Sequence, residues 1–172
     1  MWDLNGNRVW GLWVDVEVSL ISTPHPPFWE LFVDGTANQK GSGIGIILVS
    51  PKQVTMEKSL PLGFPVTNNE AEYEALRAGM IMVKKLEGKV VEVFSDSRLI
   101  MRQVKGEFKA RDQRMQWYLG KIKQLQYNFK AFSIKQVPKS KNSHANSLAT
   151  LATSSRQGLP RVIIVEDLIA SS

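Results

Sequence analysis

The stretch TNNEAEYEALRAGMIMVKKLEGKVVEVFSD, residues 67–96, decides the fold of this 172-residue chain. From Asn68 to Leu86 its apolar residues recur with the period of a helix, and its end, VVEVFSD, is an apolar run typical of a buried strand. A helical crossover is the usual connection between neighbouring parallel strands. The stretch therefore predicts a β–α–β unit, in which strand 90–96 runs parallel to a strand earlier in the chain.

Alternating and apolar segments on either side extend this unit to a complete sheet. Three strands joined by short turns are expected before it, which suggests an antiparallel meander. They are FWELFVD (28–34), IGIILVS (44–50) and VTMEKSL (54–60), with a Gly-rich turn at 34–43. The segments expected after it are helices at 98–104, 112–126 and 143–153 and a strand at 128–137. The prediction is an α/β fold with a mixed five-stranded sheet, in which the last two strands are parallel to the first.

The two ends of the chain differ from this regular part. Residues 1–27 hold three of the five tryptophans and finish in the proline-rich STPHPP, which predicts an arm followed by a linker. The arm could pair with the domain, bind a partner or be the remnant of a longer polypeptide. One domain is expected at 28–153, and a peripheral tail at 154–172.

Composition excludes several classes of function. The chain has no cysteine, so disulfides, thiolate metal sites and a cysteine nucleophile are ruled out. It lacks an apolar run of about 18 residues, and its N-terminus lacks the pattern of a secretion signal. We therefore expect a soluble intracellular protein, cytoplasmic or nuclear, without a membrane partner.

Positive charge is concentrated in one part of the chain. Residues 105–141 hold ten Lys or Arg and two acidic residues, a local charge of +8 in a chain of net charge +6. Such a cluster can bind a polyanion through counterion release. It can equally be a solvated helix face, and charge alone does not choose between the two.

Glu72 differs from the other glutamates at the start of the predicted helix. At about 100° per residue, Glu72 shares one narrow face with apolar positions, whereas Glu70 and Glu74 point to the opposite side. Those apolar positions are Leu76, Gly79, Val83 and Leu86. We therefore expect Glu72 to point inward and the other two glutamates to face solvent.

Asp34 and Asp96 each end an apolar strand. Taken singly, either aspartate suits a turn or a helix cap. If their strands are adjacent and parallel, however, both emerge at one edge of the sheet, where ligands collect in open α/β folds. Together with an inward Glu72 they would form a crowded carboxylate site, and hard oxygen ligands suit Mg²⁺ or Mn²⁺.

Four motifs in this order and spacing resemble the type 1 ribonuclease H family. They are VDGTAN (33–38), TNNEAEYEAL (67–76), FSDS (94–97) and NSHANSLATLA (142–152). The chain is most similar to the ribonuclease H domain of plant gypsy-type LTR-retrotransposon polyproteins, which show stretches like KGEFKARDQRM (105–115) and IKQVPKSKN (134–142). The resemblance covers about residues 28–153 and implies a ribonuclease H-like fold.

The resemblance implies an endonuclease that hydrolyses the RNA strand of an RNA–DNA hybrid with two Mg²⁺ ions, for which Mn²⁺ can substitute, and leaves a 3′-hydroxyl and a 5′-phosphate. Asp34, Glu72 and Asp96 match the first three metal-binding catalytic residues, with Asp34 shared between the metals. Asn146 stands at the position of the fourth. The family often has a histidine before the last helix that helps protons and product to leave, and His144 is the candidate for it, although it lies closer to position 146 than that histidine usually stands. Reverse transcriptase and integrase in one polyprotein are the implied partners.

Further positions match, or lie beside, the expected contacts with the hybrid. They are Gly35, Thr36, Asn38, Gly43, Asn68, Asn69, Ser97, Arg98 and Trp117. Gly43, like Gly41 and Gly45, would let the backbone approach RNA 2′-hydroxyls, or would serve turn and packing geometry. Asn68 could instead be a helix N-cap. Trp117 is a candidate for stacking on the DNA strand, whereas Tyr118 is expected in the core.

Asn146 is the departure from the family pattern. An amide offers a carbonyl oxygen to a metal but brings no negative charge, so we expect weaker water activation. Asn146 could belong to a natural copy that has lost or reduced activity, or it could be a deliberate replacement of an aspartate that traps a substrate complex. The prediction is a weakened metal-dependent nuclease that binds hybrids tightly. The alternative is a non-catalytic hybrid-binding domain on the same fold, and a DNA resolvase or integrase fits the TNN motif poorly.

Overall fold

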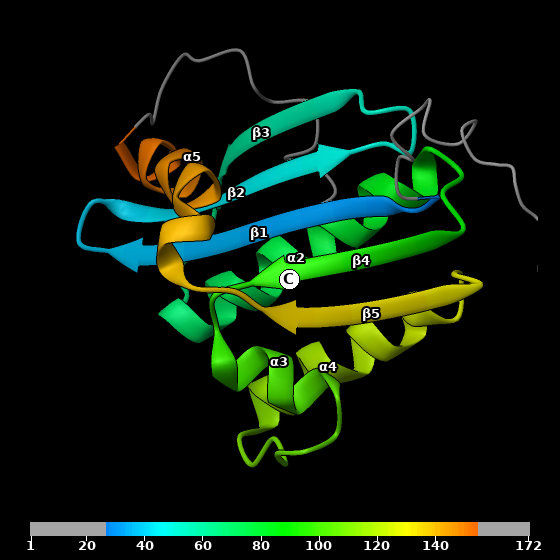
Figure 1. The fold of residues 1–172 in the computed structure, drawn as a ribbon. Coiled ribbons are helices and arrows are strands. Elements are labelled where there is room, and N and C mark those ends of the chain that lie inside the picture. The colour runs from blue at the N-terminus through cyan, green and yellow to red at the C-terminus, as the bar shows by residue number, and fades with distance from the viewer. Residues whose placement is uncertain (1–26, 155–172) are drawn as a thin grey trace, which may run out of the picture.

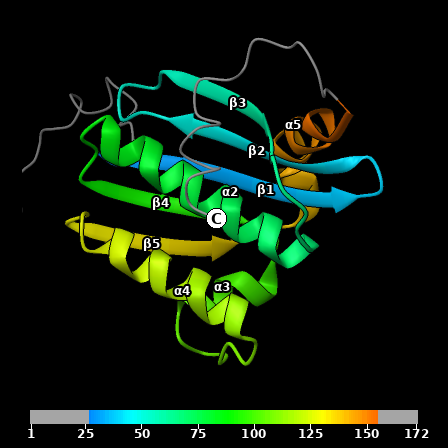
Figure 2. The same ribbon diagram turned by 180° about the vertical axis from the view of Figure 1, so that it is seen from behind.

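The computed structural model describes residues 27–154, so the predicted arm and tail lie outside the described residues except for one residue each. The described chain folds around a single five-stranded sheet in the order β3-β2-β1-β4-β5 (Figure 1). α5 lies on one face of this sheet, and α2 and α4 lie on the other (Figures 1 and 2). Between residues 27 and 154, no helix is long and apolar enough to cross a membrane.

The strands confirm the predicted sheet. β1 pairs antiparallel with β2, and β2 pairs antiparallel with β3, which is the expected meander. β4 is parallel to β1 and to β5, so the last two strands run parallel to the first. The strands are β1 (Trp29–Asn38), β2 (Gly41–Val49), β3 (Thr55–Pro61), β4 (Val90–Ser95) and β5 (Ala131–Gln136).

The first hairpin is tighter than predicted. β1 continues past Asp34 to Asn38, and β2 already begins at Gly41, so the turn is much shorter than the expected 34–43. Asn38 Oδ1 accepts a hydrogen bond from Lys40 N at 2.8 Å, which closes the turn. Gly41 has φ +145°, a backbone conformation that residues other than glycine rarely adopt. The Gly-rich composition was therefore a poor guide to where the strands stop.

The helices occupy the predicted segments within a residue or two. They are α2 (Asn68–Lys85), α3 (Arg98–Val104), α4 (Gln113–Gln126) and α5 (Ser143–Ser154), with a short 3₁₀ turn η1 (Lys139–Lys141). α2 begins with a capping box, in which Thr67 Oγ1 accepts from Glu70 N and Glu70 Oε1 accepts from Thr67 N. The N-cap is thus Thr67, and the alternative of Asn68 as the cap is wrong.

The prediction that Glu70 and Glu74 face solvent is also wrong. Glu74 is fully buried and Glu70 is 6% exposed. α4 packs across the outer side of α2, where the Tyr118 hydroxyl donates to Glu74 Oε2 at 2.6 Å. Arg114 Nε lies 2.7 Å from Glu70 Oε2. A helical wheel identifies the sheet-facing side of α2 but contains no information about a second helix on its other side.

Candidate metal centre

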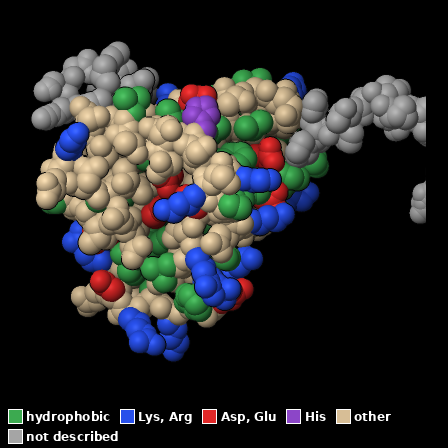
Figure 3. Space-filling view, turned by 60° about the vertical axis from the view of Figure 1, so that its left-hand side comes forward, with side chains coloured by type: hydrophobic (Ala, Val, Ile, Leu, Met, Phe, Trp, Pro, Cys, Tyr) green, Lys and Arg blue, Asp and Glu red, His purple; other side chains and the backbone are tan. Residues whose placement is uncertain are grey.

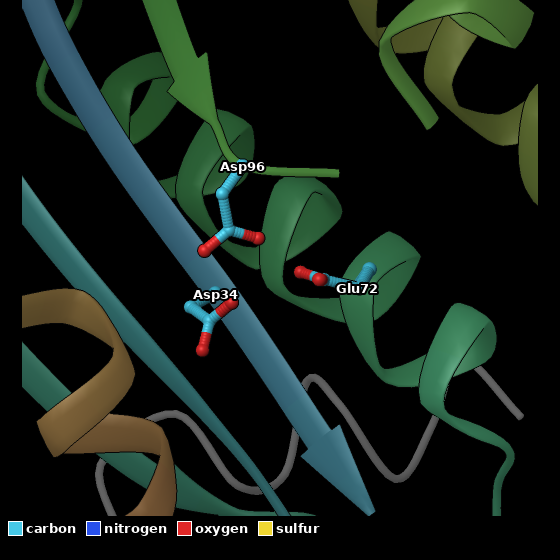
Figure 4. Close-up of side chains that lie close together, drawn as sticks. All are labelled: Asp34, Glu72 and Asp96. Atoms are coloured by element: carbon cyan, nitrogen blue, oxygen red, sulfur yellow. The ribbon is translucent and has the colours of Figure 1, made fainter. Parts of the chain in front are cut away.

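Three carboxylates from three separate elements converge at one end of the sheet. Asp34 lies on β1, Glu72 on α2, and Asp96 directly after β4. One ligand oxygen from each lies within 4.8 Å of the others. Figure 4 shows the three side chains pointing toward one another. The structure therefore brings together the three carboxylates that we expected from the sequence to form one site.

Parallel pairing of β1 with β4 sets two of these positions. Phe32 is the register partner of Phe94, and the pairing of the two strands stops there. Asp34 and Asp96 each lie two residues further on, so they emerge at the same level of the sheet. β4 ends at Ser95 while β1 continues to Asn38, so Asp96 leaves the sheet beside Asp34.

Gly35 allows Glu72 to reach the two aspartates. A Cβ atom at Gly35 would lie 2.2 Å from the backbone carbon and oxygen of Ala71, so only glycine permits this approach of α2 to β1. Gly35 N then donates to Glu72 Oε1 at 3.0 Å. The contact of Gly35 is thus with the protein's own helix, and it orients a carboxylate of the cluster.

Burial and mutual repulsion make the cluster unfavourable as a set of bare anions. Burial first, and then the charges of Asp34 and Asp96, raise the pKa of Glu72 to about 8. Burial also raises the pKa of Asp34 to about 6, although a hydrogen bond from Asn146 opposes the rise. The Lys139 charge lowers both pKa values, but by less than burial raises them. A divalent cation would offset this repulsion, and the all-oxygen donor set suits Mg²⁺ or Mn²⁺.

Asn146 reaches the cluster from the first turns of α5. Its Nδ2 donates to Asp34 Oδ2 at 2.8 Å, and its side chain is otherwise open to solvent. α5 lies close to β2 because Gly43 and Gly45 lack side chains: a Cβ at Gly45 would be 2.1 Å from Ala145 O. Gly43 similarly faces the α5 backbone at Ala149 O. The packing alternative therefore accounts for these two glycines.

His144 is not brought together with the carboxylates. Its Nε2 lies 3.3 Å from Glu57 Oε2 on β3, and its side chain is 58% exposed. It lies two positions before Asn146 on the same helix, which corresponds to a rotation of about 200° around the helix axis. Since Asn146 faces Asp34, His144 has to face elsewhere. Sequence spacing placed His144 near the site, but the helix turns it away.

The remaining candidates for nucleic-acid contact surround the cluster unevenly. Asn68 Oδ1 accepts from Ala37 N at 2.8 Å, which ties the start of α2 to β1. Ser97 is the N-cap of α3, where its Oγ accepts from Ile100 N. Candidates with side chains open to solvent are Asn38, Asn69 and Arg98, whereas Thr36 is half-buried.

Trp117 lies on α4 (Gln113–Gln126). It is 42% exposed and lines a cavity of about 450 Å³ with Gln113, Arg114 and Tyr118. Lys121 Nζ lies 5.2 Å from the centroid of the Trp117 ring, within the range of a cation–π contact. Tyr118 is 3% exposed and belongs to the core, as predicted. An aromatic ring beside two cationic side chains is the chemistry of a site for stacked bases.

Asn142 was missed by the sequence interpretation. It is 1% exposed, and its Nδ2 lies 3.4 Å from Asp96 Oδ2. Its position in NSHANSL gives little signal, because an asparagine before a helix is usually read as a cap.

The chain is similar to known proteins over most of its described length. A model of the Reverse transcriptase-like protein family matches residues 32–152. The chain is 29% identical to the putative hydrolase EbsB of Enterococcus faecalis, over 71% of this chain and 91% of that protein. Other relatives are longer: at 28% identity, the match spans 31% of a bifunctional protein of Mycobacterium tuberculosis.

Solved structures of similar fold carry the same sheet. The crystal structure of RNase H1 from Halobacterium salinarum matches with a TM-score of 0.68 at 28% identity, over 72% of this chain and 96% of that one. LC11-RNase H1, solved in complex with an RNA/DNA hybrid, matches with a TM-score of 0.67 at 28% identity, over 73% of this chain and 96% of that one. The mixed five-stranded sheet is thus that of ribonuclease H structures.

Proposed function

Because this chain belongs to the Reverse transcriptase-like protein family, we propose that it is a divalent-metal-dependent ribonuclease H that hydrolyses the RNA strand of RNA–DNA hybrids. The observation that carries the proposal is the convergence of Asp34, Glu72 and Asp96 oxygens within 4.8 Å on this fold. The likeness to an RNase H1 solved with a bound hybrid supports the choice of substrate. The products would carry a 3′-hydroxyl and a 5′-phosphate.

The residues of the cluster have distinct roles in this proposal. Asp34, Glu72 and Asp96 would hold two Mg²⁺ or Mn²⁺ ions, and Asp34 would be the ligand that the two ions share. When bound, the two ions supply Lewis acidity for the attacking water and for the leaving oxygen. The hydrogen bond from Gly35 N holds Glu72 in place, so one carboxylate is oriented before the cation arrives. The all-oxygen ligand set favours hard divalent cations.

Asn146 supplies an amide where the family pattern has a carboxylate. Its Nδ2 is engaged with Asp34, so its carbonyl oxygen is the group available to a cation. The missing negative charge lowers metal affinity at this position and weakens water activation. We therefore expect a slow nuclease that still binds hybrids, rather than a nuclease of full activity.

The substrate would lie across the strand ends and extend toward α4. Asn69, near the start of α2, and Arg98, two residues after Asp96, are exposed to solvent, where they can reach the hybrid. Trp117, with Arg114 beside it, offers a stacking surface for the DNA strand. On the face shown in Figure 3, Lys and Arg side chains lie beside the acidic ones near its centre. This charge pattern suits a polyanion that brings cations with it.

A cleavage assay with the full chain tests the proposal. A hybrid with labelled RNA is incubated with Mg²⁺ or Mn²⁺, beside duplex DNA and duplex RNA as substrate controls. We expect slow metal-dependent cleavage of the RNA in the hybrid alone, and none by Asp34→Asn, which preserves shape and removes one charge. If neither this chain nor its Asn146→Asp variant cuts the hybrid, the proposal is wrong.

A non-catalytic hybrid-binding domain is the second candidate, and Asn146 is the observation that favours it. In that case the unsubstituted chain binds the hybrid without cutting it, and only Asn146→Asp cuts.

We also propose that the domain belongs to a retroelement polyprotein with reverse transcriptase and integrase. The motif resemblance supports this context, and the foamy virus protease-reverse transcriptase shares the fold at 19% identity.

A further inference from the structure

A buried asparagine links the elements that carry the cluster. Asn142 lies between η1 and α5, and its side chain is almost fully enclosed. Its Nδ2 donates to Val33 O at 2.9 Å and lies 3.4 Å from Asp96 Oδ2. Val33 immediately precedes Asp34 on β1. One amide group therefore connects the backbone beside one carboxylate with the side chain of another.

The backbone of Asn142 also connects the site to α5, the helix that carries Asn146. Asn142 O accepts from Asn146 N at 3.0 Å in the first turn of α5. Asn146 in turn donates to Asp34. The position of Asn142 is therefore coupled to β1, to the residue after β4 and to α5, which are far apart in the sequence.

We propose that Asn142 is a positioning residue that holds Asp96 and the Asp34 segment of β1 at the separation that a shared divalent cation requires. The inference rests on the proposed function and adds a residue to it. Asn142 acts by setting the position of the Asp96 side chain relative to Asp34, and it is not itself a ligand.

The chemistry of the amide fits this role better than a purely structural one. Both neighbours of Nδ2, Val33 O and Asp96 Oδ2, are hydrogen-bond acceptors. An NH₂ group can donate to both, whereas a carboxylate at this position would repel them. Asn142 Oδ1 is buried and has no hydrogen-bond partner among the described residues. A buried unpaired oxygen costs stability, so the amide is a poor choice for stability alone. Side chains that orient metal ligands commonly change metal affinity when they are replaced.

The experiment measures metal binding without turnover. The full chain is titrated with Mn²⁺, and free Mn²⁺ is followed by electron paramagnetic resonance well below the melting temperature. We expect Asn142→Ala to weaken Mn²⁺ binding by about tenfold or more. Asn128→Ala is the matched control, since Asn128 is an exposed asparagine whose Nδ2 caps the end of α4 at Leu125 O, and it should leave binding unchanged.

A double-mutant cycle separates positioning from general destabilisation. If Asn142 acts through Asp96, the loss caused by Asn142→Ala should largely disappear in an Asp96→Asn background. Full additivity of the two losses, or a lowered melting temperature with unchanged Mn²⁺ affinity, would overturn the inference. If Asn142→Ala does not fold, Asn142→Ser, whose shorter hydroxyl cannot serve both acceptors, undergoes the same cycle.

The failure of the inference is distinct from the failure of the proposed function. Mn²⁺ binding that Glu72→Gln abolishes but Asn142→Ala leaves intact removes only the positioning role. No saturable Mn²⁺ binding by the unsubstituted chain removes both, because there is then no metal site to position.

Discussion

Asp34 and Glu72 lie where burial disfavours their ionised forms and raises the pKa of each carboxyl group. Glu72 accepts a backbone hydrogen bond from Gly35, which favours its anion, yet burial and the neighbouring carboxylates outweigh that bond. Asp34 receives a similar bond from Asn146 and still has a raised pKa. At neutral pH the metal-free cluster therefore opposes folding, and a cation should relieve the opposition.

The first prediction concerns the pH dependence of this effect. The unfolded pKa of Glu72 is 4.5 and the folded value is about 8, so the folded state holds the extra proton between these values. Stability conferred by this group is therefore full below about pH 4.5 and is lost as pH rises through about 8. Asp34 contributes in the same direction between 3.8 and about 6.

Chemical unfolding without metal, compared between the unsubstituted chain and Glu72→Gln, measures this dependence. The Gln variant should gain in relative stability as the pH rises from about 4.5 to 8, because its amide carries no charge at any pH. Added Mg²⁺ should stabilise the unsubstituted chain more at pH 8 than at pH 5. A stability difference that does not change with pH would contradict the assigned pKa.

The second prediction concerns Asn146→Asp. A carboxylate at this position would face Asp34 Oδ2, which now accepts from the amide at 2.8 Å, and like charges would replace a hydrogen bond. We expect a lower melting temperature without metal, together with metal affinity and cleavage rate higher by about tenfold or more. Thermal unfolding with and without Mg²⁺ and the hybrid cleavage assay measure the two effects. Asn146→Ala, which loses the bond without adding charge, should lower stability without the gain in activity.

At the scale of elements, glycines set how closely the helices approach the sheet. Gly35 admits α2 to β1, and Gly43 and Gly45 admit α5 to β2. α2 carries Glu72 and α5 carries Asn146, so these close approaches determine whether side chains from opposite faces of the sheet meet. The geometry of the site is thus controlled by positions that carry no side chain.

The third prediction follows from Gly45. Gly45→Ala would place a Cβ 2.1 Å from Ala145 O, and the backbone of α5 would have to move. We expect a loss of about 1–3 kcal/mol in unfolding free energy and a weaker Asn146–Asp34 contact. Gly120→Ala is the matched control: a Cβ at Gly120 of α4 meets nothing within 4 Å. In a helix interior this control should stabilise by about 0.5–1 kcal/mol.

Equilibrium unfolding of both variants gives the two free energies. A Gly45→Ala variant as stable as the unsubstituted chain would mean that α5 docks with more freedom than the close contact indicates. A crystal structure of the variant would then show where α5 has moved.

At the scale of the whole molecule, positive charge and exposed aromatic rings lie on residues 105–141, whose helix α4 packs against α2. Residues 105–141 carry the excess of Lys and Arg, and α4 presents Trp117 from within it. The carboxylate end of the sheet is acidic by itself, so a nucleic acid can be held only where cations surround that end. Figure 3 shows such cationic side chains flanking acidic ones.

The fourth prediction is that hybrid binding depends on both features. The dissociation constant should rise steeply with salt, because binding releases counterions. Trp117→Ala should weaken binding by about 1–3 kcal/mol if one base stacks on it. Tyr127→Ala is the control, since Tyr127 is 90% exposed just beyond α4. Fluorescence anisotropy with Ca²⁺ in place of Mg²⁺ measures binding, and equal affinities of all three proteins would exclude Trp117 from the interface.

Local patterns of the sequence determined most of the fold. Strand alternation and helical periodicity depend on neighbours within a few residues, so the elements and their order could be predicted. Parallel pairing of the strands before Asp34 and Asp96 follows from the crossover between them. For that reason two of the three carboxylates could be placed together from the sequence.

Only the tertiary structure decided which side chains are enclosed and what they contact. Glu70 and Glu74 are buried because α4 covers α2, and His144 turns toward Glu57 because Asn146 already faces Asp34. Asn142 donates a hydrogen bond to Val33 O, although the two residues are 109 positions apart in the sequence. Periodicity describes one element against one surface, whereas these contacts depend on several elements packed at once, and that arrangement is a property of the folded whole.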